Sequence, residues 1–387
     1  MRKGFAFIAM IAIILSNVMV HADKPYANFV FSPEYPKVNE SITFNASSSH
    51  AVNATLVNYT WDFGDGNITY GKVVTVTHAY KSEGIYRVCL RVVDNRSMNS
   101  TICKNITVDS TPPTVKYDLI PSSPNGKNGW YITKVKMEIK AKDALSGIKE
   151  VRYKIDEGVW KNYSGTIYIN NEGNHFIYFY AMDKGGNIDE GAITFKIDFT
   201  PPSTQFHVNK NATNGWYDED VNVTLAAYDT LSGIDSIHYL LDNKLYDYNG
   251  EIKIGEGNHS FIYYSTDKAG NIEELKRTRI KIDKHAPDIT LLNPTDGIYL
   301  FGRKLLASPY PIIIGNVSIE VKVIDELSGV AHVDFYIDDE LKFKDDEPPY
   351  SWEWNEQMIG VRDIQIVAYD KAGNHASVEK SVIVVNL

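Results

Sequence analysis

The sequence has few of the residues and motifs with which proteins carry out chemistry. Its 387 residues include only two cysteines and ten histidines. Neither His-Glu-x-x-His nor Gly-x-Ser-x-Gly occurs, and no histidines are paired at metal-ligand spacing. We therefore predict that the chain is not an enzyme, and we assign it no catalytic residue, no metal ligand and no cofactor.

Strong positive charge is also lacking. The formal net charge is −10 at pH 7, and no part of the chain is strongly basic. Proteins that bind nucleic acids present basic patches to the phosphates. The charge pattern therefore predicts that nucleic acid is not a partner.

After residue 22 the sequence has no helical periodicity of useful length and no apolar run near the ~20 residues that span a bilayer. The first 22 residues differ, because Arg2 and Lys3 precede an apolar run that ends in Val20-His21-Ala22. This layout is typical of a secretory signal, and a retained membrane anchor is the alternative. We predict a signal peptide over residues 1–22 and a location outside the cytoplasm, in the medium or at the cell surface, with membrane contact only through an uncleaved signal.

What the sequence does contain is many short runs of Val, Ile, Tyr and Thr, separated by Gly, Asn, Asp and Pro. Evenly spaced runs of this kind are typical of β-sandwiches. An internal repeat sets the boundaries: Asp143-Ala144-Leu145-Ser146-Gly147 recurs 86 residues later as Asp229-Thr230-Leu231-Ser232-Gly233. A looser third copy begins at Asp325, and each copy opens on proline. We predict an all-β chain of four tandem Ig-like sandwiches in an elongated array, over 23–109, 110–198, 199–283 and 284–387.

The two cysteines lie on neighbouring predicted strands. Around Cys89, the residues Tyr86, Val88, Leu90 and Val92 share one face, and the cysteine lies on the other. Cys103 likewise lies opposite the apolar face of its own strand. Adjacent antiparallel strands would bring both sulfurs together, so we predict a Cys89–Cys103 disulfide, with two free thiols as the alternative.

Glycosylation motifs are unusually dense. Asn-x-Ser/Thr occurs thirteen times, and eight of these sequons precede residue 110. The candidate asparagines are Asn39, Asn45, Asn53, Asn58, Asn67, Asn95, Asn99, Asn105, Asn162, Asn211, Asn222, Asn258 and Asn316. We predict a glycosylated surface.

One stretch, Tyr59-Thr60-Trp61-Asp62-Phe63-Gly64-Asp65-Gly66-Asn67, has the composition of a ligand loop. Its aromatics alternate as in a strand, and Asp-Gly then favours a turn because glycine accepts a positive φ. A calcium loop needs more regularly spaced oxygen ligands, and a phosphate loop needs a lysine leading into a helix. We predict a structural turn at Asp62, Gly64, Asp65 and Gly66.

These residues carry a resemblance. With Ser41-Ile42-Thr43-Phe44, His78-Ala79-Tyr80 and Gly84-Ile85-Tyr86-Arg87-Val88, the stretch around Trp61 resembles a PKD domain over residues 26–109. The spacing at Tyr86 is that of a tyrosine corner. Residues 284–387 resemble bacterial Ig-like domains, through Pro348-Pro349-Tyr350 and Tyr369-Asp370-Lys371-Ala372-Gly373-Asn374, and the two middle repeats resemble related modules. The resemblance implies roles in adhesion, surface-layer architecture or the spacing of enzyme modules, and no activity.

Three features leave an alternative open. The repeated Asp-x-x-Ser-Gly and Asp-Lys-x-Gly-Asn motifs are interpreted as turn caps, with asparagine tolerating a left-handed backbone, and calcium is the alternative. The acidic run Asp338-Asp339-Glu340 is interpreted as a solvated hairpin, again with calcium as the alternative. The run 175–180 is apolar on both strand faces, and its second face is either covered, in contact with a neighbouring domain, or open for stacking on sugars.

The resulting hypothesis is a non-catalytic secreted or cell-surface glycoprotein for adhesion or surface architecture, with cell-surface proteins or polysaccharide as partners. The alternative is a carbohydrate-binding accessory protein for an extracellular hydrolase carried on another chain.

Overall fold

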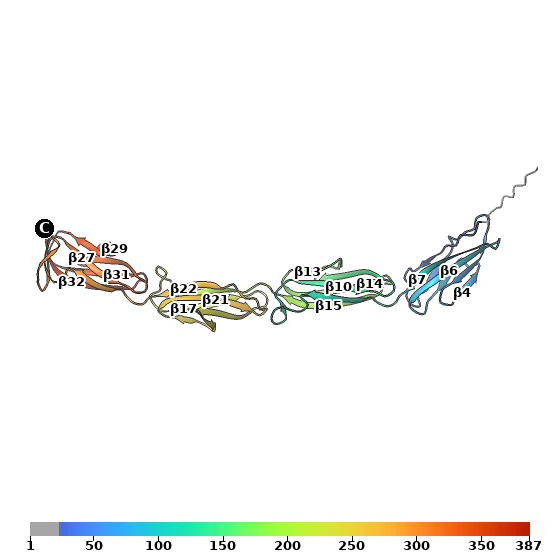
Figure 1. The fold of residues 1–387 in the computed structure, drawn as a ribbon, viewed down its shortest axis with the longest axis horizontal. Helices are drawn as coiled ribbons and strands as arrows, with labels where there is room; N and C mark the ends of the chain where they lie inside the picture. The colour runs from blue at the N-terminus through green and yellow to red at the C-terminus, as the bar shows by residue number, and fades with distance from the viewer. Residues whose placement is uncertain (1–22) are drawn as a thin grey trace, which may run out of the picture. The chain divides into compact units, whose positions relative to one another are not determined.

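The computed structural model describes residues 23–387, and the predicted signal lies outside these residues. Within them, every regular element is a β-strand, as Figure 1 shows. In the described part of the chain there is accordingly no helix long and apolar enough to cross a membrane. The strands form eight sheets, which follow one another along the chain as four pairs, here called the first to the fourth sandwich. The all-β prediction is confirmed.

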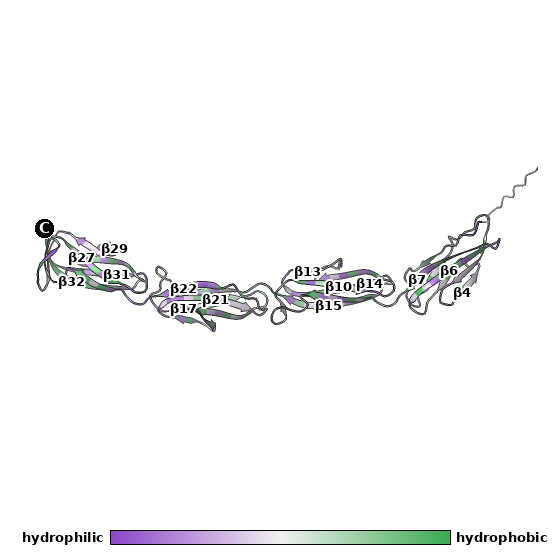
Figure 2. Cartoon of the chain, in the orientation of Figure 1, coloured by the Kyte–Doolittle hydropathy of each residue, from purple (hydrophilic) through white to green (hydrophobic). Residues whose placement is uncertain are grey.

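The first sandwich contains a three-stranded and a four-stranded sheet, with the orders β1-β2-β5 and β4-β3-β6-β7. Its strands are β1 (Val30–Ser32), β2 (Ile42–Asn45), β3 (Leu56–Asp62), β4 (Ile68–Gly71), β5 (Thr75–His78), β6 (Gly84–Asp94) and β7 (Asn99–Val108). Strand β6 shows how the sequence sets the layers: Val88, Leu90 and Val92 are fully buried and alternate with more exposed residues. Figure 2 shows the same banding of hydrophobic and hydrophilic residues along the labelled strands.

The second and third sandwiches share one strand order, except that the second has one more short strand, β9, at the edge of its larger sheet. The second has the sheet orders β13-β10-β8 and β12-β11-β14-β15-β9. Its strands are β8 (Thr114–Ile120), β9 (Trp130–Tyr131), β10 (Val135–Lys142), β11 (Ile148–Ile155), β12 (Lys161–Asn162), β13 (Ile167–Ile169), β14 (Gly173–Asp183) and β15 (Ile188–Ile197). The third has the orders β16-β17-β20 and β19-β18-β21-β22. Its strands are β16 (Ser203–Val208), β17 (Val221–Tyr228), β18 (Ile234–Leu241), β19 (Lys244–Asp247), β20 (Ile252–Ile254), β21 (Gly257–Asp267) and β22 (Lys276–Ile282).

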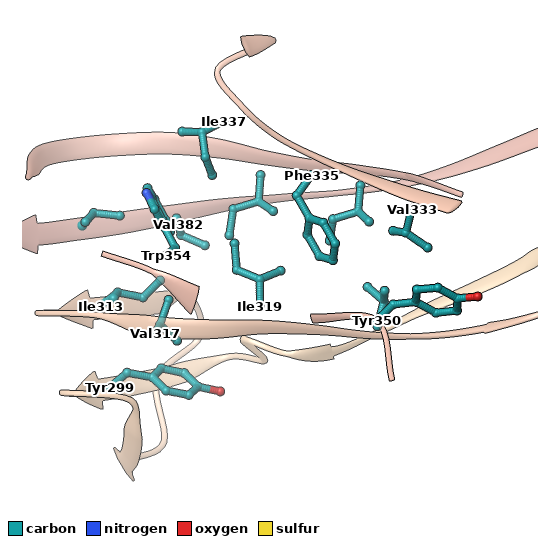
Figure 3. Packing of buried hydrophobic residues seen from close by; sticks show 14 of the residues in the cluster. Tyr299, Ile313, Val317, Ile319, Val333, Phe335, Ile337, Tyr350, Trp354 and Val382 are labelled. Atoms are coloured by element: carbon teal, nitrogen blue, oxygen red, sulfur yellow. The ribbon is translucent and has the colours of Figure 1, made fainter. Parts of the chain in front are cut away.

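The fourth sandwich keeps this plan and enlarges one sheet, giving the orders β23-β27-β30 and β25-β24-β26-β32-β31-β28-β29. Its strands are β23 (Asp288–Asn293), β24 (Gly297–Leu300), β25 (Arg303–Leu306), β26 (Pro311–Ile314), β27 (Val317–Ile324), β28 (Val330–Ile337), β29 (Glu340–Asp345), β30 (Ser351–Trp354), β31 (Met358–Asp370) and β32 (His375–Asn386). Figure 3 shows its core, where Ile319 from one sheet packs in a buried cluster with Phe335 and Val382 from the other.

Grouped by contacts, the chain divides into two compact units. One comprises the described residues 23–122 with 135–170 and 174–195, and the other comprises 123–134, 171–173 and 196–387. The four-domain division with its boundaries, and the elongated array, stay predictions.

Candidate functional site

The turn after β3 is held by its own carboxylates. Asp62 Oδ1 accepts a hydrogen bond from the Gly64 N–H (2.9 Å), and Asp65 Oδ1 accepts one from the Asn67 N–H (3.1 Å). Asp65 Oδ2 lies 2.7 Å from His78 Nε2. Burial opposes the charge of Asp65, but the hydrogen bonds from Asn67 and His78 outweigh it and lower the pKa of this carboxyl.

Glycine is required within this turn. Gly64 and Gly66 have φ values of 77° and 93°, and a Cβ on Gly64 would lie 2.7 Å from the Arg87 carbonyl oxygen. Both carboxylates are therefore used by the turn itself, and the predicted structural turn is present.

The strand β6 carries two further predicted features. The Tyr86 hydroxyl donates to the Ser82 carbonyl oxygen (3.0 Å), which confirms the tyrosine corner. Cys89 and Cys103 are direct cross-strand partners on β6 and β7 and form the predicted disulfide.

The sequons reach the surface. None of the thirteen asparagines is buried; ten are exposed, and the other three, Asn45, Asn58 and Asn222, are half-buried. Their attachment sites are therefore open to modification, and glycosylation itself stays a prediction.

The first repeated motif, Asp-x-x-Ser-Gly, forms a tight turn around its aspartate. In the second sandwich, Asp143 Oδ2 accepts hydrogen bonds from the N–H groups of Leu145 (3.0 Å) and Gly147 (2.7 Å). Asp229 repeats both bonds in the third sandwich, and Asp325 repeats the one to the motif glycine in the fourth. Each motif glycine has a φ near 80°. The turn-cap interpretation is confirmed for these aspartates.

The second motif, Asp-Lys-x-Gly-Asn, ends the long strands β14, β21 and β31. Asp183 Oδ1 accepts the Asn187 N–H (2.8 Å), and Asp267 and Asp370 accept the equivalent bonds. The expectation that the asparagine adopts a left-handed backbone is wrong, because the positive φ lies on the preceding glycine. The asparagine acts instead through its side chain: Asn187 Nδ2 donates both to Asp183 Oδ2 (2.8 Å) and to the Asp109 carbonyl oxygen (3.2 Å).

That last bond leads to residues that the sequence reasoning missed. Asp109, Asp198 and Asp283, here called the linker aspartates, follow the last strands of the first three sandwiches. Each donates its N–H to a backbone carbonyl of the preceding sandwich, for example Asp198 to Tyr131 (2.9 Å). Each accepts the N–H of the next motif serine, for example Asp109 from Ser146 (2.9 Å). Their recurrence shortly before each opening proline was the signal that could have found them.

The linker aspartate and the two motif aspartates meet in each repeat. These groups, here called the first, second and third clusters, are Asp109/Asp143/Asp183, Asp198/Asp229/Asp267 and Asp283/Asp325/Asp370. Within a cluster the nearest ligand oxygens all lie within 4.8 Å of one another, a spacing at which one ion could be shared. Asp283 is also within this distance of Glu256 and His285. The linker aspartates and the aspartates that end the long strands are at most 2% exposed.

This burial has an electrostatic consequence. Desolvation raises the pKa of Asp198, and the neighbouring Asp229 and Asp267 carboxylates raise it further. Burial, with a contribution from Asp283, raises the pKa of Asp370 in the same way. The protein therefore holds these carboxylates in positions that disfavour their charge.

The acidic run in the fourth sandwich differs from the aspartate clusters, because it forms an exposed hairpin with a basic partner. Asp338 and Asp339 have positive φ values and form the hairpin between β28 and β29. Asp338 pairs with Arg362 (3.0 Å) and accepts the Asp363 N–H (3.0 Å). The run is thus the hairpin that the sequence predicts.

An aromatic face lies on the second sandwich. On β14, Ile177 and Phe179 are buried in the core, whereas Phe176, Tyr178 and Tyr180 occupy the other face. Trp160 makes an edge contact with Tyr180 (ring centroids 5.1 Å), and the Lys154 ammonium lies 5.0 Å from the Tyr178 ring centroid. Trp160 and Tyr178 are 43% and 41% exposed, so this face of the central strand is partly open.

Family models match the two ends of the chain. Residues 22–109 match the PKD domain, and residues 287–376 match a bacterial Ig domain. The chain therefore contains a PKD domain followed by a bacterial Ig-like domain, and both resemblances are confirmed.

Curated relatives match over short stretches. A microbial collagenase of Vibrio alginolyticus is 38% identical over 74 residues, which is 19% of this chain and 9% of the relative. Collagenase ColA of Bacillus cereus is 31% identical over 99 residues, or 26% of this chain and 9% of the relative. The match lies in the PKD region, and the chain spans about a tenth of the length of these relatives.

Solved structures with similar folds include single modules and tandem arrays. The PKD1 domain of Vibrio anguillarum Epp is 27% identical, covers 23% of this chain and 99% of its own, and has a TM-score of 0.21. A tetra-tandem repeat from the extending region of a large adhesion protein is 11% identical, covers 94% and 100%, and has a TM-score of 0.29. Likenesses of this size carry no functional information.

Proposed function

We propose that this chain is a non-catalytic glycoprotein, secreted through its N-terminal signal, that serves adhesion or surface architecture. The proposal rests on one observation: the chain repeats the same aspartate turns in three successive sandwiches. A protein that repeats its connections is suited to setting the spacing and order of modules. The PKD and bacterial Ig domains, which are typical of extracellular proteins, support the location.

Cell-surface proteins or polysaccharides are the partners that this function requires. The test is binding of the labelled chain, residues 23–387, to whole cells and isolated envelopes of its source. We expect saturable binding that is competed by unlabelled chain and absent with heat-unfolded chain. Binding no greater than that of an unrelated tandem sandwich protein would contradict the proposal.

The spacing role also predicts an elongated particle. Small-angle scattering of residues 23–387 should give a maximum dimension far above that of a compact globule of equal mass, because each ~85-residue module can bury its own core. A globular scattering profile would contradict this arrangement and would reopen the search for a shared site.

A second candidate function is a carbohydrate-binding accessory to an extracellular hydrolase on another chain. The partly exposed Trp160 and Tyr178 favour it, because flat aromatic rings with polar edges stack on sugars. Pull-down on a panel of insoluble polysaccharides is the test. If this candidate is right, Trp160→Ala lowers the retained fraction at least tenfold, and Tyr70→Ala, which removes an exposed aromatic of the first sandwich, leaves it unchanged. No retention on any polysaccharide would remove this candidate.

A further inference from the structure

Each aspartate cluster gathers negative charge away from water without a positive partner. Two of the three carboxylates in every cluster are at most 2% exposed. Like charges within 4.8 Å in a partly desolvated site repel each other strongly. The hydrogen bonds that these carboxylates accept offset part of this repulsion, and protonation, a nearby cation from the protein or a bound ion would offset the rest.

The protein does not supply the cation. Among the ion pairs within 4.0 Å in residues 23–387, none involves any of the nine cluster aspartates, whereas exposed carboxylates such as Asp118 and Asp338 do have basic partners. The motif lysines are close: a Cβ on Gly147 would lie 3.7 Å from Lys184 Nζ. These lysines therefore lie beside the turns without pairing with the carboxylates.

A second observation points to a missing ligand. Ser146 is 5% exposed, and its hydroxyl oxygen is buried without a hydrogen-bond partner among the described residues. A buried hydroxyl without a partner is uncommon and costly. Ser146 lies in the turn that binds Asp109 and Asp143, and the equivalent hydroxyl of Ser328 lies 3.3 Å from Asp325 Oδ1. The equivalent hydroxyl of Ser232 instead accepts the Ala269 N–H (3.1 Å), so the unpartnered serine hydroxyl is a feature of the first cluster.

The half-buried aspartate of each cluster also has a spare oxygen. Asp143 and Asp229 each use one carboxylate oxygen for both turn hydrogen bonds, and Asp325 uses one oxygen for its turn. In the described chain, the other oxygen, Oδ1 of Asp143 and Oδ2 of Asp229 and Asp325, accepts no hydrogen bond. Spare carboxylate oxygens and a buried hydroxyl are the ligands that a hard divalent cation takes.

We propose that each of the three clusters binds one calcium ion, with the linker aspartate and the two motif aspartates as ligands. The donor set of the first two clusters is all oxygen, which favours calcium or magnesium over zinc. Calcium accepts irregular oxygen sites with six to eight ligands, whereas magnesium demands a regular octahedron and keeps its water. The bound ion neutralises the buried charge and ties the linker to both turns of the repeat that follows it.

The experiment counts ions on purified residues 23–387. After treatment with a chelator, the chain is titrated with calcium chloride up to about 5 mM, above the ~10⁻³ M range of weak extracellular modules. We expect three calcium ions per chain and at least tenfold weaker binding of magnesium chloride. Saturating calcium, at about 100 times the dissociation constant, should raise Tm by roughly 10 °C or more.

The variants remove only the spare oxygen. Asp143→Asn, Asp229→Asn and Asp325→Asn keep the oxygen that caps the turn and replace the other with NH₂, so the fold should persist. Each variant should bind two ions, and the triple variant none. Glu326→Gln is the matched control, because this exposed carboxylate follows Asp325 directly but is outside the cluster, and it should still bind three.

Ser146→Ala provides a test that does not depend on the aspartate variants folding. It should weaken one of the three calcium sites several-fold and leave the other two unchanged. The proposal is overturned if the native chain binds no calcium, or if the folded triple variant binds as many ions as the native chain. The calcium count is made without cells or polysaccharide. The calcium proposal can therefore be contradicted while the proposed adhesive function stands, and the adhesive function can be contradicted while the calcium sites stand.

Discussion

The PKD sandwich and the repeats that follow it surround the carboxylates of their turns with different partners. In the PKD sandwich, Asp65 is matched by His78 and by the amide of Asn67. In the repeats, Asp183 and its equivalents receive hydrogen bonds but no protein cation. The PKD sandwich also has the only disulfide of the described residues. The PKD sandwich is thus stabilised by a disulfide and by contacts between its own side chains, whereas the proposed sites of the repeats take their calcium ions from solution.

The disulfide should give the largest difference between the two regions. Replacing Cys89 and Cys103 together by alanine removes a link across 14 residues, which stabilises by about 3 kcal/mol in the chain-entropy model. Calorimetry should show one transition, that of the PKD sandwich, at lower temperature, with the others unmoved. Peptide mapping without reductant should recover the two cysteine peptides linked, and free thiols in protein from the native host would end this prediction.

Calcium should act on the opposite region with a slightly smaller effect. At 100 times the dissociation constant, a ligand that binds only the folded state adds about 2.7 kcal/mol. Adding a chelator should therefore lower the melting temperature of the repeats and leave that of the PKD sandwich unchanged. A uniform shift of all transitions would show that the two regions are not independent.

A single substitution in the turn of the PKD sandwich should have the next largest effect on stability. Asp65→Ala removes the acceptor for Asn67 and His78, and we expect a loss of about 1–3 kcal/mol in the PKD sandwich. Calcium stoichiometry should stay at three, because Asp65 belongs to no cluster. Asp118→Ala, at an exposed carboxylate of the second sandwich, is the control, and a calcium ion lost in Asp65→Ala would overturn the structural-turn interpretation.

The same substitution has a pH dependence. The pKa of Asp65 is lowered in the folded protein, so its contribution is complete above its ordinary pKa range and is lost as the pH falls through the folded value. The difference in unfolding free energy between the native chain and Asp65→Ala should therefore shrink in acid. A difference that is constant from pH 7 to pH 3 would contradict this.

The smallest effect is expected at the tyrosine corner. Tyr86→Phe deletes the hydroxyl that bonds to Ser82 but keeps the ring stacked on Tyr80, at a cost of about 1 kcal/mol. Tyr70→Phe changes a ring that is 77% exposed and should leave the denaturant midpoint unmoved. If the two variants have equal denaturant midpoints, the tyrosine corner does not contribute measurably to stability.

Local pattern was enough to predict much of this fold. Alternation of apolar residues around Cys89 placed its side chain and its disulfide correctly, because a strand has a strict two-residue period. Asp-Gly at Asp65 identified its turn for a similarly local reason. In both cases the groups that decide the structure are neighbours in sequence or on paired strands.

The aspartate clusters could not be predicted in the same way. The carboxylates of Asp109 and Asp183 are far apart in sequence and meet only in the folded chain, so single motifs cannot reveal the negative charge that they gather. The asparagine of the second motif was misread because its type is common at left-handed positions, whereas here its amide group bridges two segments far apart in sequence. In the sequence, long-range side-chain hydrogen bonds of this kind can be recognised only because the spacing of their residues repeats between the motif copies.

The edge strand β7 has a consequence for how the protein behaves when it is produced. It is the last strand of its sheet, so one side of its ten-residue backbone has no strand partner, and such edges readily pair with other chains. Two sequons, Asn99 and Asn105, lie on this strand and are exposed. Oligosaccharides at these positions would keep a second copy from adding to the sheet. Material made in a host that does not glycosylate should therefore aggregate more readily, and replacing Asn99 and Asn105 by lysine should restore part of the lost solubility.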